Sequence, residues 1–274
     1  MHGAGNDYIF VDARGLDKDW PALSVAMSDR HLGVGSDGLI LARESNRADL
    51  RMTMFNSDGS EGEMCGNGIR CLVGFALTRG LVPTGKSLVM VETLAGDMSV
   101  APTWDEGRVV RATVGMGEPS VAVEDIPVIA PGRATLMDYP LEIDGAMFKI
   151  GCVSMGNPHA VAFLDTPVDE IPLHDIGPKI EKHPMFPQRV NFEIVNVIDP
   201  GHVKVRVWER GSGLTMACGT GACAVAVIGR MKGLTGDDVT VSLPGGDLSI
   251  SWPGRGEVIM EGPVEEVFEG EWRD

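Results

Sequence analysis

Short segments in which apolar and polar residues alternate recur along this chain. Residues 49–55 and 203–208 alternate in this way, so each is predicted to be a β-strand with one buried face. Each strand is followed by a Gly-rich turn and then by a segment that is apolar on nearly every side, 69–78 or 222–231. A helix without a polar face is expected to lie buried inside a sheet rather than on its surface.

The same series of features occurs twice, which indicates an internal duplication. Cys65-Gly66-Asn67-Gly68 in the first copy matches Cys218-Gly219-Thr220-Gly221 in the second. The other matching segments keep the same order along the chain: 5–10 with 156–161, 94–100 with 245–250, and 114–117 with 258–261. We therefore predict an α+β protein of two pseudo-symmetric halves, each a curved, mostly antiparallel sheet wrapped around one central helix.

The two halves are expected to cover 1–117 and 118–262, with one cysteine of the duplicated turn in each. The stretch 118–146 is rich in proline and has no helical period. It is therefore predicted to form the crossing between the halves.

Charge and hydropathy exclude several classes of partner. The formal net charge of −16 argues against nucleic acid and anionic membranes, which repel an acidic surface. No apolar run approaches the roughly 18 residues that span a bilayer. The N-terminal residues include neither a basic nor an apolar segment, so no signal peptide is expected and the default location is the cytoplasm.

The cysteines do not form a disulfide or metal pattern. There are 5 of them, an odd number, and no Cys-x-x-Cys pair occurs, so neither a disulfide framework nor a zinc site is expected. No spacing among the histidines suggests another metal site. Cys71 and Cys223 lie on a different helix face from Cys65 and Cys218, and Cys152 lies in an apolar strand. These three cysteines are therefore predicted to be packing residues.

Cys65 and Cys218 have the sequence context of catalytic thiols. Each lies where a strand ends and a helix begins, where free backbone N–H groups can hold a carboxylate and are expected to lower a thiol pKa. Two such thiols facing each other across a cleft would supply an acid and a base on opposite faces of one carbon. This pattern favours a cofactor-independent racemase or epimerase. The alternative for the pair is a regulatory disulfide.

Polar residues at matched positions complete the candidate site. Asn6 and Asn157 occupy equivalent turns, as do Asn56 and Glu209. A carboxylate at Glu209 could accept an ammonium group, and the neighbouring Arg210 could hold a carboxylate. No phosphate-binding Gly-rich lysine loop occurs and no lysine has a comparable Gly-rich context, so no cofactor is expected.

Eight motifs in one order resemble those of diaminopimelate epimerase over essentially the whole length of the chain. They are residues 1–7, 30–38, 55–60, 65–71, 155–159, 190–191, 208–211 and 217–222. The resemblance implies interconversion of LL- and meso-diaminopimelate without a cofactor, commonly by a homodimer. It also implies that the C-terminal strand, 263–274, returns to the first half, and that family chains have a strand ahead of the Met1-His2-Gly3 motif.

Carried onto this sequence, the resemblance assigns a role to each site residue. Cys65 and Cys218 would be the two acid/base residues, and His159 and Glu209 would tune their protonation. The N–H groups around Gly66-Asn67 and Gly219-Thr220 would bind the carboxylate at the reacting carbon. The residues implied to hold the amino and carboxylate groups of the substrate are Asn6, Asn56, Asn157, Asn191, Glu209 and Arg210.

Two other functions are compatible with these motifs. The proline racemase and hydroxyproline epimerase group shares the two thiols, but this chain has Asn67 rather than a histidine after Cys65-Gly66. A non-catalytic amino-acid-binding protein could also use the same fold. Binding needs neither thiol, so a Cys65→Ala variant separates that function from epimerisation.

Overall fold

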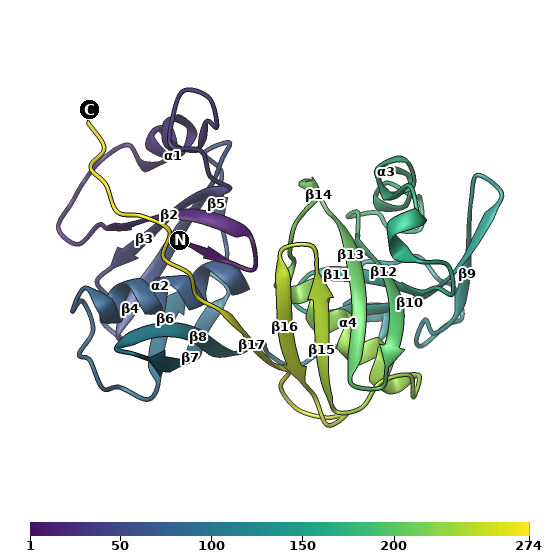
Figure 1. Cartoon of the computed structure of the whole chain (residues 1–274). Coiled ribbons are helices and arrows are strands. Elements are labelled where there is room, and N and C mark those ends of the chain that lie inside the picture. The colour runs from purple at the N-terminus through teal and green to yellow at the C-terminus, as the bar shows by residue number, and fades with distance from the viewer. Residues whose placement is uncertain (274) are drawn as a thin grey trace. The chain divides into compact units, whose positions relative to one another are not determined.

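The computed structural model describes residues 1–273, which form two compact units (Figure 1). One unit consists of residues 1–114 and 261–273, and the other of Gly115–Met260. Asp274, the last residue of the C-terminal strand expected from the resemblance, lies outside the described residues. In residues 1–273, no helix is both long enough and apolar enough to cross a lipid bilayer.

The first unit is a mostly antiparallel sheet. Its strands are β1 (His2–Gly3), β2 (Asn6–Asp12), β3 (Gly38–Arg43), β4 (Leu50–Asn56), β5 (Glu61–Gly62), β6 (Val89–Thr93), β7 (Gly96–Asp105) and β8 (Arg108–Gly115). β3 runs parallel to β2 and antiparallel to β4, and β4 runs parallel to β6, which forms a hairpin with β7. β8 continues the sheet from β7 and also pairs with β17 (Ile259–Pro263).

The second unit repeats this order of pairing. Its strands are β9 (Tyr139–Ile143), β10 (Ala146–Ser154), β11 (Pro158–Phe163), β12 (Asn191–Asp199), β13 (His202–Glu209), β14 (Gly213–Leu214), β15 (Asp238–Leu243) and β16 (Gly246–Ser251). β11–β12 is parallel, β12–β13 antiparallel, β13–β15 parallel and β15–β16 antiparallel, which corresponds pair by pair to β2, β3, β4, β6 and β7. The predicted α+β class and mostly antiparallel sheets are confirmed.

One helix in each unit is buried among the strands. α2 (Gly66–Thr78) packs against β1, β2, β3 and β7, and α4 (Gly219–Met231) against β10, β11, β12, β15 and β16. Residues 66–77 of α2 are all buried, as expected for a helix without a polar face. Both helices begin three residues before their predicted start, because the cysteine side chain caps the first turn.

The two helices also end in the same way. Gly80 (φ +67°) and Gly233 (φ +70°) follow α2 and α4 in the left-handed conformation that glycine adopts without strain. The remaining helices are α1 (Trp20–Ser28) and α3 (Leu173–Glu181), with short 3₁₀ turns η1 (Val123–Asp125) and η2 (Val168–Glu170). Thus the repeat read from the sequence extends to the ends of the central helices.

Two segments differ from the sequence expectation. The stretch 118–146 is not a bare crossing: β9 pairs with β10, and Ile126, Leu136 and Leu141 are buried in the core of the second unit. The C-terminal strand ends at Pro263, and only an isolated bridge between Glu265 and His2 extends the pairing. Beyond Val264 the described tail is exposed, so it has no buried apolar face to hold it in a sheet.

Candidate active site

Each predicted catalytic cysteine is the N-cap residue of the buried helix in its unit. Cys65 has φ −133° and ψ 120°, and Cys218 has φ −127° and ψ 113°. The Gly68 N–H donates to Cys65 Sγ at 3.4 Å, and the Gly221 N–H donates to Cys218 Sγ at 3.4 Å. Both sulfurs therefore lie at the positive end of a helix, in the same backbone geometry.

The Cys65 thiol contacts the side chains of β2. Cys65 Sγ donates to Asn6 Oδ1 at 3.3 Å, and Asn67 Nδ2 donates to the same oxygen at 3.4 Å. Tyr8 lies two residues further along β2, on the same face of the strand, and is buried. Its burial and the charge and hydrogen bond of Cys65 raise the pKa of the Tyr8 phenol well above its usual value.

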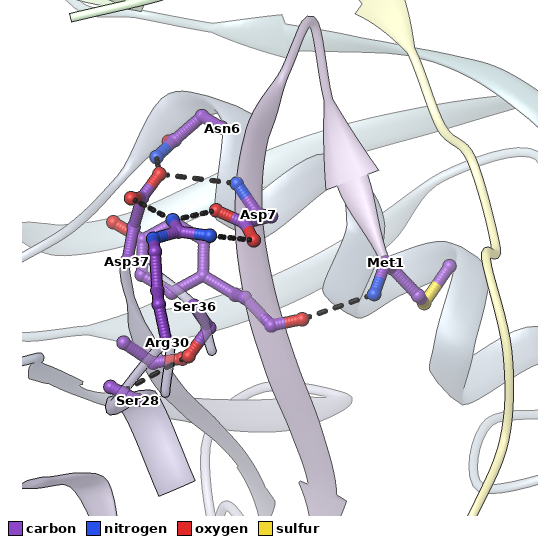
Figure 2. A network of polar contacts seen from close by, with 9 residues as sticks. Met1, Asn6, Asp7, Ser28, Arg30, Ser36 and Asp37 are labelled. Carbon is purple, nitrogen blue, oxygen red and sulfur yellow. Dashed lines mark hydrogen bonds and ion pairs between the residues drawn. The ribbon is translucent and has the colours of Figure 1, made fainter. Parts of the chain in front are cut away.

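A network of charged residues holds Asn6 on its other side. Asn6 Nδ2 donates to Asp37 Oδ2 at 2.6 Å, and the Asp7 N–H donates to the same oxygen at 3.2 Å. Arg30 binds the carboxylates of both Asp7 and Asp37 (Figure 2). Burial raises the pKa of Asp37, and the hydrogen bond from Asn6 opposes that rise.

The Cys218 thiol lies beside hydroxyl and carboxyl groups. Cys218 Sγ is 3.6 Å from Thr220 Oγ1, which accepts a hydrogen bond from Asn157 Nδ2 at 3.3 Å. Thr215 Oγ1 donates to Glu209 Oε1 at 2.5 Å. Burial raises the pKa of Glu209, and hydrogen bonds with Thr215 and Cys218 oppose that rise.

The fully buried side chain of Glu193 contacts His159. His159 Nδ1 is 2.7 Å from Glu193 Oε1, and His159 Nε2 is 2.9 Å from Asn157 Oδ1. Both His159 and Glu193 have no exposed surface. Burial raises the pKa of Glu193, an effect that the neighbouring His159 opposes. The sequence reasoning missed Glu193, although it follows Asn191 by two positions and therefore shares its strand face.

The expected lowering of the thiol pKa is wrong for Cys218. Burial raises the pKa of this thiol well above its usual value, and the nearby Glu209 and Glu193 raise it further. Thr220 and the Gly221 N–H oppose the rise. Desolvation and two carboxyl groups therefore outweigh the helix N-terminus.

The three remaining cysteines are buried, as predicted. Cys71, Cys152 and Cys223 are at most 1% exposed. Burial raises the pKa of Cys71 to about 11 and that of Cys152 to about 12. Unlike Cys65 and Cys218, none of these three cysteines caps a helix, which supports their interpretation as packing residues.

Other predicted site residues form local contacts. Asn56, at the end of β4, donates through Nδ2 to Ser60 Oγ at 2.9 Å. Asn191 Nδ2 donates to the carbonyl of Pro158 at 3.0 Å, and its Oδ1 accepts from the Arg210 N–H at 2.8 Å. The Asn191 amide is therefore occupied by backbone groups, and it holds the strand end that carries Arg210.

Two more pairs of predicted residues form the first turns of the central helices. Gly66 and Asn67 open α2, and Gly219 and Thr220 open α4. The Asn67 side chain is buried and accepts from Arg70 Nη2 at 2.8 Å. In residues 1–273, no three His, Cys, Asp or Glu side chains are grouped so that they could hold a metal ion.

The structure brings predicted site residues together in two sets, one in each unit. In the first set, Cys65 and Asn67 both donate to Asn6 Oδ1, and Tyr8 lies beside Cys65. The second set is Cys218, Thr220, Asn157, His159 and Glu209. Tyr8 was also missed from the sequence, although it occupies the position that His159 has in the second copy of the repeat.

Comparisons with known proteins identify the family of this chain. The sequence model of the family described as "Diaminopimelate epimerase" matches residues 1–122 and 151–267. A diaminopimelate epimerase of Acetivibrio thermocellus is 50% identical over 273 residues, covering 99% of this chain and 96% of that protein.

Two solved structures share the fold at low sequence identity. A PhzF-family phenazine biosynthesis protein of Bacillus anthracis has a TM-score of 0.68 and 16% identity, and the match covers 97% of this chain and 96% of that one. A probable proline racemase of Agrobacterium radiobacter has a TM-score of 0.69 and 15% identity, covering 96% and 88%.

Proposed function

This chain belongs to the diaminopimelate epimerase family, and from that premise we propose that it interconverts LL- and meso-2,6-diaminopimelate. The reaction inverts one α-carbon by removing its proton on one face and returning a proton on the other. The α-carbon is a weak acid, so a close base and fixed donors for the developing charge are required.

In the proposed mechanism, Cys65 and Cys218 are the acid and the base. One acts as thiolate and takes the α-proton, while the other acts as thiol and donates its proton to the opposite face. The two sulfurs exchange protonation states in each turnover, so no external oxidant, reductant or cofactor is needed. The observation that carries this proposal is the matched position of both thiols as helix N-caps, each with one backbone N–H on its sulfur.

The residues around the thiols suit the recognition of an amino acid. The N–H groups of Gly66-Asn67 and Gly219-Thr220 lie at helix N-termini, where a carboxylate is favoured. His159 and Glu209 tune the protonation of the two thiols. The residues that hold the amino and carboxylate groups of the substrate are Asn6, Asn56, Asn157, Asn191, Glu209 and Arg210. Asn191 also accepts from the Arg210 N–H.

Several wider properties follow from the same premise. The two functional halves are proposed to be residues 1–117 together with the C-terminal segment 263–274, and residues 118–262. The enzyme acts in the cytoplasm as a homodimer, in the supply of lysine and of the cell wall. Nucleic acid and membranes are not partners, since the net charge is −16.

The test is to incubate reduced protein with LL-diaminopimelate in D₂O without added cofactor. Deuterium at the α-carbon is followed by NMR, and the meso product by chiral chromatography. Deuterated meso product supports the proposal. Exchange on proline or hydroxyproline instead would assign the chain to that group, and no exchange on any of the three would leave an amino-acid-binding protein.

A further inference from the structure

We propose that Asp37 is a positioning residue that turns the side-chain amide of Asn6 so that its oxygen faces the Cys65 thiol. Asp37 belongs to the 30–38 motif, to which the proposed mechanism gives no role. The inference rests on the proposed function in one respect only, that Cys65 acts on the substrate. Its geometry is independent of the identity of that substrate.

The oxygen and the nitrogen of an asparagine amide have opposite effects on the protonation of a neighbouring thiol. The oxygen accepts from the protonated thiol, whereas the nitrogen would donate to the thiolate. The Asp37 carboxylate only accepts hydrogen bonds, so it binds Asn6 Nδ2, at 2.6 Å. The Asn6 oxygen is thereby directed at Cys65 Sγ, at 3.3 Å, and at Asn67 Nδ2, at 3.4 Å.

Asp37 is itself held rigidly. Arg30 Nη2 donates to Asp37 Oδ1 at 2.9 Å and to Asp7 Oδ1 at 2.7 Å, while Arg30 Nη1 donates to Asp7 Oδ2 at 3.1 Å (Figure 2). On the backbone, the Asp37 N–H donates to the Asp7 carbonyl at 2.8 Å, and the Asp37 carbonyl accepts from the Ser57 N–H at 3.2 Å. Rotation of the carboxylate would break the hydrogen bonds from Arg30 Nη2 and from the Asp7 N–H, so the carboxylate can fix the amide of Asn6.

The sequence builds this position through the loop before β3. A side chain at Gly33 would come within 2.2 Å of the Ala26 carbonyl, so only glycine allows the loop to fold back on α1. The parallel register then pairs Gly38 with Tyr8, which places Asp37 beside Asp7 and next to Asn6.

The charges around Asp37 explain why it acts on Cys65 mainly by orienting the Asn6 amide. Asp37 faces Asp7 and Arg30, and the guanidinium offsets much of the charge of the two carboxylates. On the thiol side, Cys65 acts electrostatically on the titratable groups of Tyr8 and Cys71. The Asp37 carboxylate therefore acts on Cys65 chiefly through the amide of Asn6.

The test measures alkylation of Cys65 by iodoacetamide at pH 7 in the reduced, folded protein, with each cysteine peptide quantified by mass spectrometry. In Asp37→Ala the amide is released and the protonated thiol loses its acceptor, so the rate at Cys65 rises about fivefold, the value of one hydrogen bond. Asp37→Asn keeps an oxygen that accepts from Asn6 Nδ2, so its rate stays within about twofold of wild type. Cys218, in the other unit, is the internal reference, and its rate is unchanged.

Asp12→Ala is the matched control, because Asp12 lies on β2 and is likewise paired with an arginine, but the Asn6 amide bonds to Asp37 and not to Asp12. An unchanged rate in Asp37→Ala would overturn the inference, and equal increases in Asp37→Ala and Asp37→Asn would show that charge alone acts. Should Asp37→Ala fail to fold, Asn6→Ala removes the same oxygen and is expected to give the same rise. Wild-type turnover is assayed separately, so a missing epimerase activity would refute the proposed function without deciding the role of Asp37.

Discussion

His159 Nδ1 and Glu193 Oε1 lie 2.7 Å apart, and neither side chain has any exposed surface. The second oxygen of Glu193, Oε2, has no hydrogen-bond partner within residues 1–273. A buried carboxyl group with one unbonded oxygen is costly to ionise, and burial accordingly raises the pKa of Glu193. This buried pair therefore makes the free energy of unfolding depend on pH.

The first prediction concerns that pH dependence. A carboxyl group with a raised pKa in the folded state favours folding while it is protonated, so its contribution is present at acidic pH and is lost as the pH rises through the folded-state pKa. Glu193→Gln removes this loss, so the free energy of unfolding should fall less for the variant than for wild type as the pH rises above 4.5, the ordinary pKa of a glutamate carboxyl. Urea unfolding at several pH values measures the difference, with the exposed Glu142→Gln as control. Parallel pH curves for wild type and Glu193→Gln would contradict it.

The second prediction separates catalytic from packing cysteines. Cys65→Ala and Cys218→Ala each remove one of the two proton-transfer groups, so turnover of LL-diaminopimelate should fall by about 10²–10⁴ or more. Cys152→Ala removes a buried sulfur and should cost about 1–2 kcal/mol of stability with turnover largely kept. Steady-state kinetics and thermal unfolding give both readouts. If either active-site variant kept most of its turnover, the two-base mechanism would be wrong.

The third prediction concerns the Tyr8 hydroxyl. A phenol that donates to sulfur stabilises the thiolate, so Tyr8→Phe should slow alkylation of Cys65 at pH 7 by about threefold to tenfold. This direction is opposite to that expected for Asp37→Ala, so the two variants test different contacts of one thiol. An alkylation rate equal to that of wild type would mean that the hydroxyl has no influence on Cys65.

The fourth prediction tests the space behind Cys218. A methyl group at Gly221 would lie 2.8 Å from Glu193 Oε1 and 3.3 Å from Cys218 Sγ. Gly221→Ala should therefore displace one of these groups and lower turnover by at least about tenfold, even though alanine is the better helix former. Gly236→Ala is the matched control, since its new methyl group would lie 3.7 Å from the Pro200 carbonyl oxygen, at ordinary contact distance. Normal kinetics in Gly221→Ala would show that Glu193 and Cys218 can shift without loss of activity.

The fifth prediction uses the duplicated helix ends. Alanine at Gly80 or Gly233 must adopt a φ near +70°, which costs about 1–2 kcal/mol. Each substitution should lower the free energy of unfolding by a similar amount, and neither should change kcat because open space surrounds both positions. Denaturant unfolding of the two variants checks this, and a large difference between them would mean that the helix ends are not equivalent.

The sequence alone was sufficient for features set by local patterns. Alternation identified β4 and β13, uniform apolar composition identified the buried helices α2 and α4, and the repeated Cys-Gly turn located both helix N-caps. These predictions depend on residues close together in the chain, where side-chain period and glycine conformation decide the structure. The duplication also predicted that the two units share one architecture.

Tertiary structure decided which distant residues meet at each thiol. Asp37 reaches Asn6 because β2 and β3 pair in parallel, and Glu193 reaches His159 because β11 and β12 do so in a corresponding register. The raised pKa of Cys218 depends on burial and on two carboxyl groups brought from other strands, which no local motif encodes. The local sequence pattern therefore determined the helices and strands and the place of each cysteine at a helix N-terminus. Strand register and desolvation, both long-range effects, determined the environment of each thiol.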